Sequence, residues 1–335
     1  MRSVAVLGGG SFGTAIANII ADNGHQVGVW LRDKTLVDQF QRSGENVKYL
    51  PGYPLNPKVQ FTNDLKSLCT HAEIIFLAIP SKSFRSVLQQ IKPYVSPDQM
   101  MISTAKGIEA DSFMLMSQVI EQELGTTKVG VLSGPNLAVE IAQRKLTGTV
   151  IASNDKELNK TIQTLLSQPY FRVYANDDVF GVELGGALKN IYAIAAGMAD
   201  ALGMGENTKG MLITRSLAEM SRMAAKLGGN PSTFLGLSGV GDLMVTCSSP
   251  LSRNYQLGYL LGEGLTLDEA NTKLNQTVEG VNTVRLVRNK AQELGLYMPL
   301  VSGMYAILFD GQDLKTVISD LMMGEHADDV EFSLR

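Results

Sequence analysis

The stretch SVAVLGGGSFG, residues 3–13, decides how the chain begins to fold. Its first half is an apolar run that predicts a strand, and the segment 14–21 predicts a helix. In a G-x-G-x-x-G turn, Gly8 permits the tight turn, Gly10 lets the backbone approach a pyrophosphate, and Gly13 allows close helix packing. Free N–H groups at the helix start would hold the pyrophosphate. We therefore predict a dinucleotide site; the alternative is a glycine-rich turn without a ligand.

Short β-branched runs alternate with helical stretches through the first half of the chain. The predicted strands are 3–7, 26–31, 59–61, 73–79, 100–105, 129–132, 148–152 and 171–174. Amphipathic helices such as 112–124 and 156–167 lie between them. This alternation indicates βαβ units with right-handed crossovers and a mostly parallel sheet.

After Asp178 the strands disappear and apolar residues recur with the 3.6-residue period of helices. The predicted helices are 179–202, 209–227, 255–261, 267–274, 283–294, 300–309 and 313–322. Helix ends are expected at Gly262, Gly264, Gly295 and Gly311. We therefore predict a Rossmann-type, doubly wound α/β domain that binds NAD(P) over 1–178. An all-α substrate and catalytic domain follows over 179–335.

Composition excludes several other classes of protein. The 335 residues are 44% hydrophobic and 19% charged, which is globular, and a net charge of −4 argues against nucleic acid as partner. Two cysteines, Cys69 and Cys247, build no disulfide framework, and together with only three histidines they form no zinc-ligand pattern, so we expect no metal. The glycines at 8–10 interrupt the uncharged N-terminal segment, so we expect no signal peptide or membrane span and a soluble, cytoplasmic protein.

The cofactor's adenosine end should be recognised after the second strand, in Trp30-Leu31-Arg32-Asp33. An acidic residue there suits the ribose 2′-OH of NAD, whereas an arginine suits the 2′-phosphate of NADP. Strand alternation makes Arg32 and Asp33 point in opposite directions. We favour NADPH, held by Arg32, over NADH; the alternative is a solvated turn.

Lysines stand at two positions where chemistry is expected. Lys106 follows a buried strand, at the sheet edge where α/β proteins bind ligands, although a surface turn would also explain it. Lys189, beside Asn190, lies in an apolar helix, where desolvation would lower the pKa of an ammonium and make it an acid/base group. The alternative for Lys189 is a lysine whose stem packs on the helix while its charge reaches water.

Two further polar groups lie in the second half. Asp242 ends the glycine-rich run LSGVGD and could be a helix N-cap, a site residue or both. Ser252, Arg253 and Asn254 precede a helix predicted from Tyr255. An arginine with small donors at a helix N-terminus is typical of a phosphate site.

Seven motifs occur in one order along nearly the whole chain: GGGSFGTA, TAKGIE, SGPN, LKNIYAI, GENTKGMLITRSLAEM, LSGVGDL and SRNY. They resemble the soluble bacterial NAD(P)-dependent sn-glycerol-3-phosphate dehydrogenases. The resemblance implies that the all-α domain is similar to the C-terminal domain of 6-phosphogluconate dehydrogenase. The resemblance implies a cytoplasmic, dimeric enzyme that interconverts dihydroxyacetone phosphate and sn-glycerol 3-phosphate, which supplies phospholipid synthesis.

The resemblance also implies roles for individual residues. Lys189 matches the family's proton-transfer lysine, with Lys106 and Asp242 beside it in the chemistry. The positions that match substrate-binding residues are Lys106, Gly134, Asn136, Lys189, Asp242, Ser252, Arg253 and Asn254. Those that match cofactor-binding residues are Gly8, Gly10, Ser11, Phe12, Gly13, Arg32, Lys106, Ala138, Arg253 and Glu279. Family members usually carry Ser or Thr where Asn136 stands and often Trp where Phe12 stands.

Two other functions remain compatible with the motifs. One is a related dehydrogenase of another small oxo acid or phosphosugar; the Ser252–Asn254 cluster favours a phosphorylated substrate. The other is a dinucleotide-sensing protein without turnover. The three groups Lys106, Lys189 and Asp242 argue against a sensor, because a sensor needs no proton donor.

Overall fold

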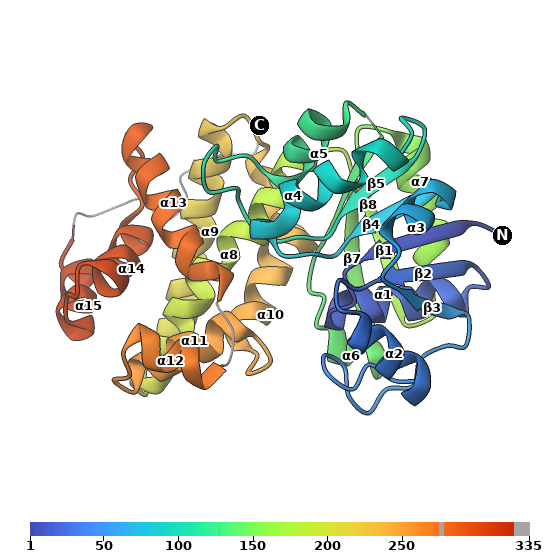
Figure 1. Cartoon of the computed structure of the whole chain (residues 1–335). Helices are drawn as coiled ribbons and strands as arrows, with labels where there is room; N and C mark the ends of the chain where they lie inside the picture. Colours follow the sequence, from blue (N-terminus) through green and yellow to red (C-terminus); the bar gives the residue numbers. More distant parts are fainter. Residues whose placement is uncertain (127, 275–277, 325–335) are drawn as a thin grey trace. The chain divides into compact units, whose positions relative to one another are not determined.

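In the computed structural model, residues 1–126, 128–274 and 278–324 are described, and the chain divides into two compact units, Met1–Val179 and Phe180–Arg335 (Figure 1). The first unit is an α/β unit and the second is helical. The predicted fold class, a Rossmann-type domain followed by an all-α domain, is confirmed.

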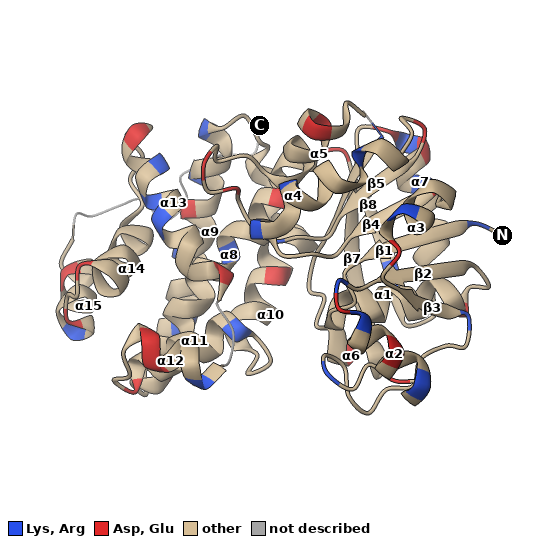
Figure 2. Ribbon diagram, viewed as in Figure 1, with Lys and Arg blue, Asp and Glu red and all other residues tan. Residues whose placement is uncertain are grey.

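The first unit is built on one eight-stranded sheet in the order β3-β2-β1-β4-β5-β6-β7-β8. Its strands are β1 (Ser3–Leu7), β2 (Gln26–Trp30), β3 (Val59–Thr62), β4 (Ile74–Leu77), β5 (Met100–Ser103), β6 (Val129–Ser133), β7 (Thr147–Ala152) and β8 (Phe171–Asn176). All neighbours are parallel except β6 and β7. The strands β1 to β7 carry no charged residue and appear tan in Figure 2, because helices cover both faces of the sheet.

The helices of this unit are α1 (Ser11–Asp22), α2 (Lys34–Ser43), α3 (Leu65–His71), α4 (Ser81–Ile91), α5 (Met116–Leu124), α6 (Ala138–Ala142) and α7 (Lys156–Leu166). The start of the helix predicted at 112 is wrong. Phe113 has a φ of +59°, which no helix accepts, and Leu115 forms a β-bridge with Ile108. The helix α5 therefore begins only at Met116.

The described part of the second unit consists of helices, with no strand. They are α8 (Val179–Ala201), α9 (Glu206–Lys226), α10 (Asp242–Ser248), α11 (Arg253–Gly262), α12 (Leu267–Leu274), α13 (Glu279–Glu293), α14 (Pro299–Phe309) and α15 (Leu314–Met322). A π-helical turn, Leu237–Gly241, runs directly into α10. Among the described residues, α8 is the one helix long and apolar enough to cross a membrane, yet 83% of that apolar window is buried, as in a core helix.

Glycines bring α8 and α11 into backbone contact. A Cβ added at Gly197 would lie 2.1 Å from the carbonyl oxygen of Tyr255, and one added at Gly258 would lie 1.9 Å from that of Ile194. No side chain larger than hydrogen fits at either position. Gly262 belongs to the same contact and is the last residue of α11, so its predicted place at a helix end is confirmed.

Candidate active site

The glycine turn after β1 has the geometry of a dinucleotide site. Gly8 has a φ of +114°, and a Cβ at Gly13 would lie only 2.1 Å from the carbonyl oxygen of Gly8. At Gly10 a Cβ would meet nothing within 4 Å, so the backbone there borders open space. No side chain caps the N-terminus of α1, which begins at Ser11. The first N–H groups of α1 thus fit a pyrophosphate.

Arg32 and Asp33 both follow the end of β2 but differ in their contacts. Asp33 is the N-cap of α2, where its carboxylate accepts from the Thr35 hydroxyl at 2.7 Å and the Thr35 N–H at 2.8 Å. The hydroxyl bond, followed by the backbone bond, lowers the pKa of Asp33. Arg32 is exposed. Both side chains are exposed, but the carboxylate of Asp33 is engaged in capping α2.

Lys106 stands on the loop that follows β5. Its Nζ donates to the carbonyl oxygen of Gly134, 3.0 Å away on the loop after β6. The side chain of Asn136, two residues on, donates from Nδ2 to Thr149 Oγ1 in β7. These three predicted site residues thus converge at one end of the sheet. Phe12 and Ala138 are half-buried, in α1 and at the start of α6.

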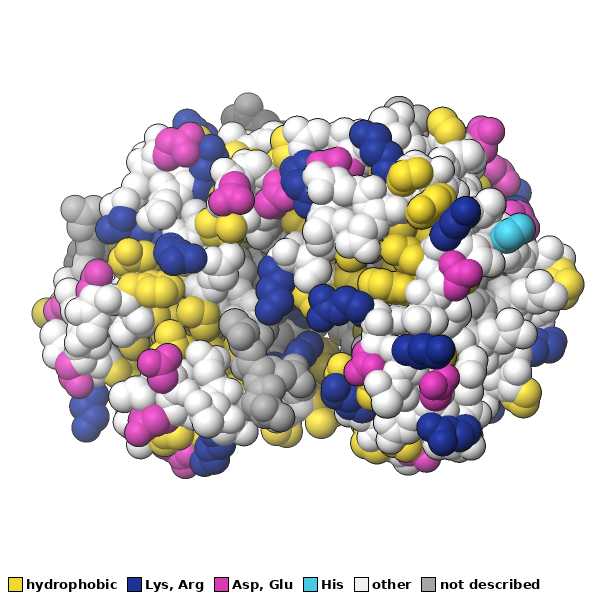
Figure 3. Space-filling model, viewed as in Figure 1, with side chains coloured by type: hydrophobic (Ala, Val, Ile, Leu, Met, Phe, Trp, Pro, Cys, Tyr) yellow, Lys and Arg dark blue, Asp and Glu magenta, His cyan; other side chains and the backbone are white. Residues whose placement is uncertain are grey.

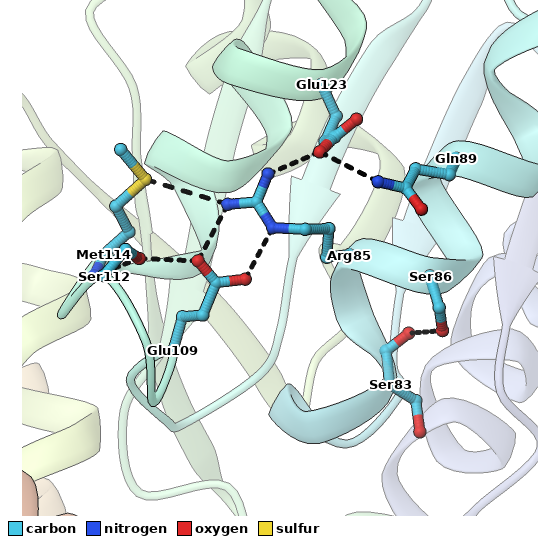
Figure 4. A network of polar contacts seen from close by, with 8 residues as sticks. All are labelled: Ser83, Arg85, Ser86, Gln89, Glu109, Ser112, Met114 and Glu123. Atoms are coloured by element: carbon cyan, nitrogen blue, oxygen red, sulfur yellow. Dashed lines mark hydrogen bonds and ion pairs between the residues drawn. The ribbon is translucent and has the colours of Figure 1, made fainter.

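A salt-bridge network joins the loop that carries Lys106 to α4 and α5 through Glu109 (Figure 4). Arg85 of α4 contacts both carboxylate oxygens of Glu109 at 2.7 Å and also pairs with Glu123 of α5. The hydrogen bond from Arg85 keeps the pKa of Glu109 below its usual value. Because Glu109 lies three residues after Lys106, the guanidinium fork fixes the far end of this loop.

In the second unit, Lys189 of α8 meets the first turn of α10. Its Nζ donates to the carboxylate of Asp242 and, at 2.7 Å, to Thr246 Oγ1. Lys189 is 5% exposed and Asp242 1%. Lys189 is buried, as the apolar helix predicts, but it is paired with a carboxylate. That charge favours an ammonium, whereas desolvation disfavours it.

The alternative assignment of Asp242 as a helix N-cap is wrong. Asp242 has helical backbone angles, and Gly241 takes the N-cap position without a side-chain bond. The preceding π-helical turn continues into α10, so the carboxylate of Asp242 does not cap the helix and instead pairs with Lys189.

Sequence reasoning missed Thr246. Its hydroxyl accepts from Lys189 and donates to the carbonyl oxygen of Asp242 at 2.5 Å. The available signal was its spacing, four residues after Asp242 on the same helix face. Cys247, next in the chain, is buried, and burial raises the pKa of its thiol to about 12, so it stays an unreactive thiol.

The predicted phosphate cluster begins α11 two residues earlier than expected. Ser252 is the N-cap, and its hydroxyl accepts from the backbone N–H of Tyr255. Arg253 is exposed at the first helical position. An exposed arginine at a helix N-terminus retains the geometry of an anion site.

Asn254 links α11 to two other helices. Its Oδ1 accepts from the N–H of Gly280 at 3.1 Å, and its Nδ2 donates to Asn190 Oδ1 at 2.9 Å. The obligate backbone donor fixes both amides, so Asn190 is oriented beside Lys189. Glu279 begins α13, directly before Gly280. The predicted contact of Asn254 with substrate stays a prediction.

Comparison with known proteins identifies the relatives of this chain. The model of the NAD-dependent glycerol-3-phosphate dehydrogenase N-terminus matches residues 3–159, and that of the C-terminus matches residues 178–319. A glycerol-3-phosphate dehydrogenase (NAD(P)+) from Ectopseudomonas mendocina is 57% identical over 332 residues, 99% of this chain and 97% of that protein. One from Alcanivorax borkumensis is 55% identical over 333 residues, with the same coverage of 99% and 97%.

The crystal structure of glycerol-3-phosphate dehydrogenase from Coxiella burnetii aligns with a TM-score of 0.91 at 37% identity, covering 96% of this chain and 98% of that one. Fold and site define an oxidoreductase with a nicotinamide cofactor. The chain belongs to the NAD-dependent glycerol-3-phosphate dehydrogenase family.

Proposed function

We propose that this protein reduces dihydroxyacetone phosphate to sn-glycerol 3-phosphate, reversibly, and uses NADPH in preference to NADH. The family match and the relatives' names support the reaction. The observation that carries it is the buried pair of Lys189 and Asp242, because buried ion pairs often fail to repay their desolvation and ionisable groups in such surroundings are concentrated at functional sites.

The proposed roles follow from charge and position. A bound nicotinamide supplies the hydride to the substrate carbonyl carbon. Lys189 donates the proton to the oxygen during reduction and removes it during oxidation. Asp242 and Thr246 hold the Lys189 nitrogen at a fixed point. Lys106 stabilises the developing negative charge, a contribution of the kind that costs ~10²–10³ in rate when lost.

Arg253 is proposed to hold the substrate phosphate. It is exposed at the first position of α11, where a guanidinium and the positive end of the helix dipole favour a dianion. Binding of the phosphate would orient the carbonyl carbon and contribute to the rate from a distance.

The preference for NADPH rests on Arg32. Asp33, the acidic residue that would suit the ribose of NADH, caps α2 instead. The test of the whole proposal is the loss of NADPH absorbance when dihydroxyacetone phosphate is added, compared with NADH. If NADPH were oxidised with a small oxo acid or phosphosugar but not with dihydroxyacetone phosphate, the protein would be a related dehydrogenase with a different substrate.

We also propose a homodimer in the cytoplasm. The helix α14 carries no charge, yet only Val301 and Met304 of it are buried, and apolar side chains gather on the surface near it (Figure 3). An apolar helix face that the described residues leave this exposed is typical of a subunit interface. Both cysteines are free, as expected in a reducing compartment. Light scattering after gel filtration would test the dimer; a monomer at micromolar concentration would contradict it.

A further inference from the structure

A chain of hydrogen bonds lies behind the loop between β6 and α6. Thr149 Oγ1 is 3.0 Å from the carbonyl oxygen of Ser133, and Asn136 Nδ2 is 2.9 Å from the same Oγ1. Thr149 is fully buried in β7. Gly134, with a φ of +138°, lets the loop lie against it, since a Cβ there would be 3.2 Å from Thr149 Cα. The loop thus rests directly on Thr149.

The direction of these hydrogen bonds follows from their first member. A carbonyl oxygen only accepts, so the Thr149 hydroxyl donates its single hydrogen to Ser133. The lone pairs of Thr149 Oγ1 then accept from Asn136, which requires the Nδ2 end of that amide to face β7. The Oδ1 atom of Asn136 is consequently held on the opposite side of the amide.

Asn136 Oδ1 is a buried acceptor that receives no hydrogen bond from the residues described, 1–126, 128–274 and 278–324. A buried polar atom left in this state has lost its hydrogen bonds to water without replacement, which is unfavourable. The same loop carries the Gly134 carbonyl that accepts from Lys106. The acceptor is therefore fixed in direction, finds no donor in the described part of the chain, and belongs to the loop that Lys106 contacts.

We propose that Thr149 is a positioning residue that orients the Asn136 amide, so that Oδ1 accepts a hydrogen bond from a neutral donor on a bound ligand. This inference rests on the proposed function, in which the substrate carries a hydroxyl and the nicotinamide carries a carboxamide NH₂. A carboxylate or phosphate oxygen placed there would face a fixed acceptor and be rejected. Thr149 thereby contributes to specificity without touching the ligand.

Thr149→Val is the decisive variant, because it removes the hydroxyl at nearly constant volume. We expect one binding constant to weaken by about 5- to 30-fold, which corresponds to one misdirected hydrogen bond. A raised KM for dihydroxyacetone phosphate identifies the substrate hydroxyl as donor. A raised Kd for NADPH, measured by its fluorescence, identifies the carboxamide. Thr149→Ser, which keeps the hydroxyl, should restore the constant.

A double variant tests whether Thr149 acts through Asn136. In an Asn136→Ala background, Thr149→Val should change neither constant further. Thr147→Val is the matched control, because Thr147 lies in the same strand and its hydroxyl donates only to the Lys145 carbonyl oxygen in the described structure. It should leave both constants unchanged.

Three results would overturn the inference. The first is an unchanged KM for dihydroxyacetone phosphate and an unchanged Kd for NADPH in Thr149→Val. The second is that Thr149→Ser impairs binding and lowers the melting temperature as much as Thr149→Val does. The third is that the effects of Asn136→Ala and Thr149→Val add in the double variant. Failure of the proposed function is distinguishable, because the wild type would then bind NADPH without reducing dihydroxyacetone phosphate. The Kd values of Thr149→Val for NADPH and for glycerol 3-phosphate would still decide the role of Thr149; if neither weakened, the inference would fall.

Discussion

The Nζ atom of Lys189 and the carboxylate of Asp242, 53 residues apart in the chain, form an ion pair whose side chains are 6% and 2% exposed. Two charges removed from water in this way repay their desolvation only in good geometry. Thr246 improves that geometry by accepting from the same nitrogen at 2.7 Å. The pair is therefore a weak source of stability, which agrees with the proton-exchange role proposed for Lys189.

Replacing Lys189 by Met should lower kcat by ~10²–10⁴, the usual contribution of a general acid, while NADPH still binds. The unpaired Asp242 would also destabilise the fold by about 3–5 kcal/mol. The double variant Lys189→Met/Asp242→Asn removes that charge and separates the two effects. Turnover near the wild-type rate in either folded variant would remove Lys189 from the chemistry.

Removing the charge of Arg32 should alter the choice of cofactor. Arg32→Ala is expected to raise the KM for NADPH by about tenfold or more, because one or two charge-assisted hydrogen bonds to the 2′-phosphate are lost. The KM for NADH should rise far less. Lys34→Ala, two residues on and equally exposed, is the control. Equal effects of Arg32→Ala on both cofactors would assign Arg32 a structural role.

Arg253→Lys should impair dihydroxyacetone phosphate strongly and leave dihydroxyacetone, which lacks the phosphate, almost unchanged. The reason is that lysine keeps the charge but not the planar fork that binds two phosphate oxygens. Steady-state kinetics with both substrates, together with the Kd for NADPH, make the comparison. Equal losses on both substrates, or a weakened cofactor, would place Arg253 in cofactor binding or in the fold.

The Arg85 network predicts an effect at a distance. Glu109→Gln weakens the ion pair with Arg85 that holds the Lys106 loop. It should lower kcat/KM by about tenfold to 10²-fold, because a small displacement of Lys106 misplaces its charge. Arg85→Lys should have a similar effect, and the two changes together should be less than additive. Arg42→Lys, on the exposed face of α2, is the control. Additive losses would show that the two residues act separately.

Glu219 of α9 is a fully buried carboxylate outside the proposed site. It accepts from the N–H groups of Leu300 and Val301, which begin α14, and from the hydroxyl of Tyr192. Burial raises the pKa of Glu219 from 4.5 to about 7, although these hydrogen bonds act in the opposite direction. The folded state therefore holds a proton that the unfolded state has released.

Stability should consequently fall as the pH rises through this range. The loss in the free energy of unfolding caused by Glu219 begins near pH 4.5 and is complete by about pH 7, where it amounts to roughly 3 kcal/mol at most. Melting temperatures measured across that range should show wild type losing stability relative to Glu219→Gln. Glu263→Gln, at an exposed position, should follow the wild type. Parallel curves for wild type and Glu219→Gln would contradict the raised pKa.

The sheet and its glycine turn were predictable because buried parallel strands are continuous apolar runs and because the turn needs glycines at fixed spacing. Local pattern could not decide the role of Asp242, since an aspartate after a glycine-rich turn suits both an N-cap and a π-helical turn. It could not place Thr246 either, because its partner Lys189 is 57 residues away. The predicted start of α5 was wrong because hydrophobic periodicity carries no information about the positive φ of Phe113.

The contact of α8 with α11 through Gly197 and Gly258 has a consequence for substrate length. The backbones touch with no adjustable side chain between them. They therefore fix how far the lysine on one helix stands from Arg253 at the start of the other. If these are the acid and the phosphate anchor, this spacing measures the carbon chain between carbonyl and phosphate. Alanine at either glycine would force the helices apart, so we expect discrimination against phosphorylated ketones with longer carbon chains to weaken.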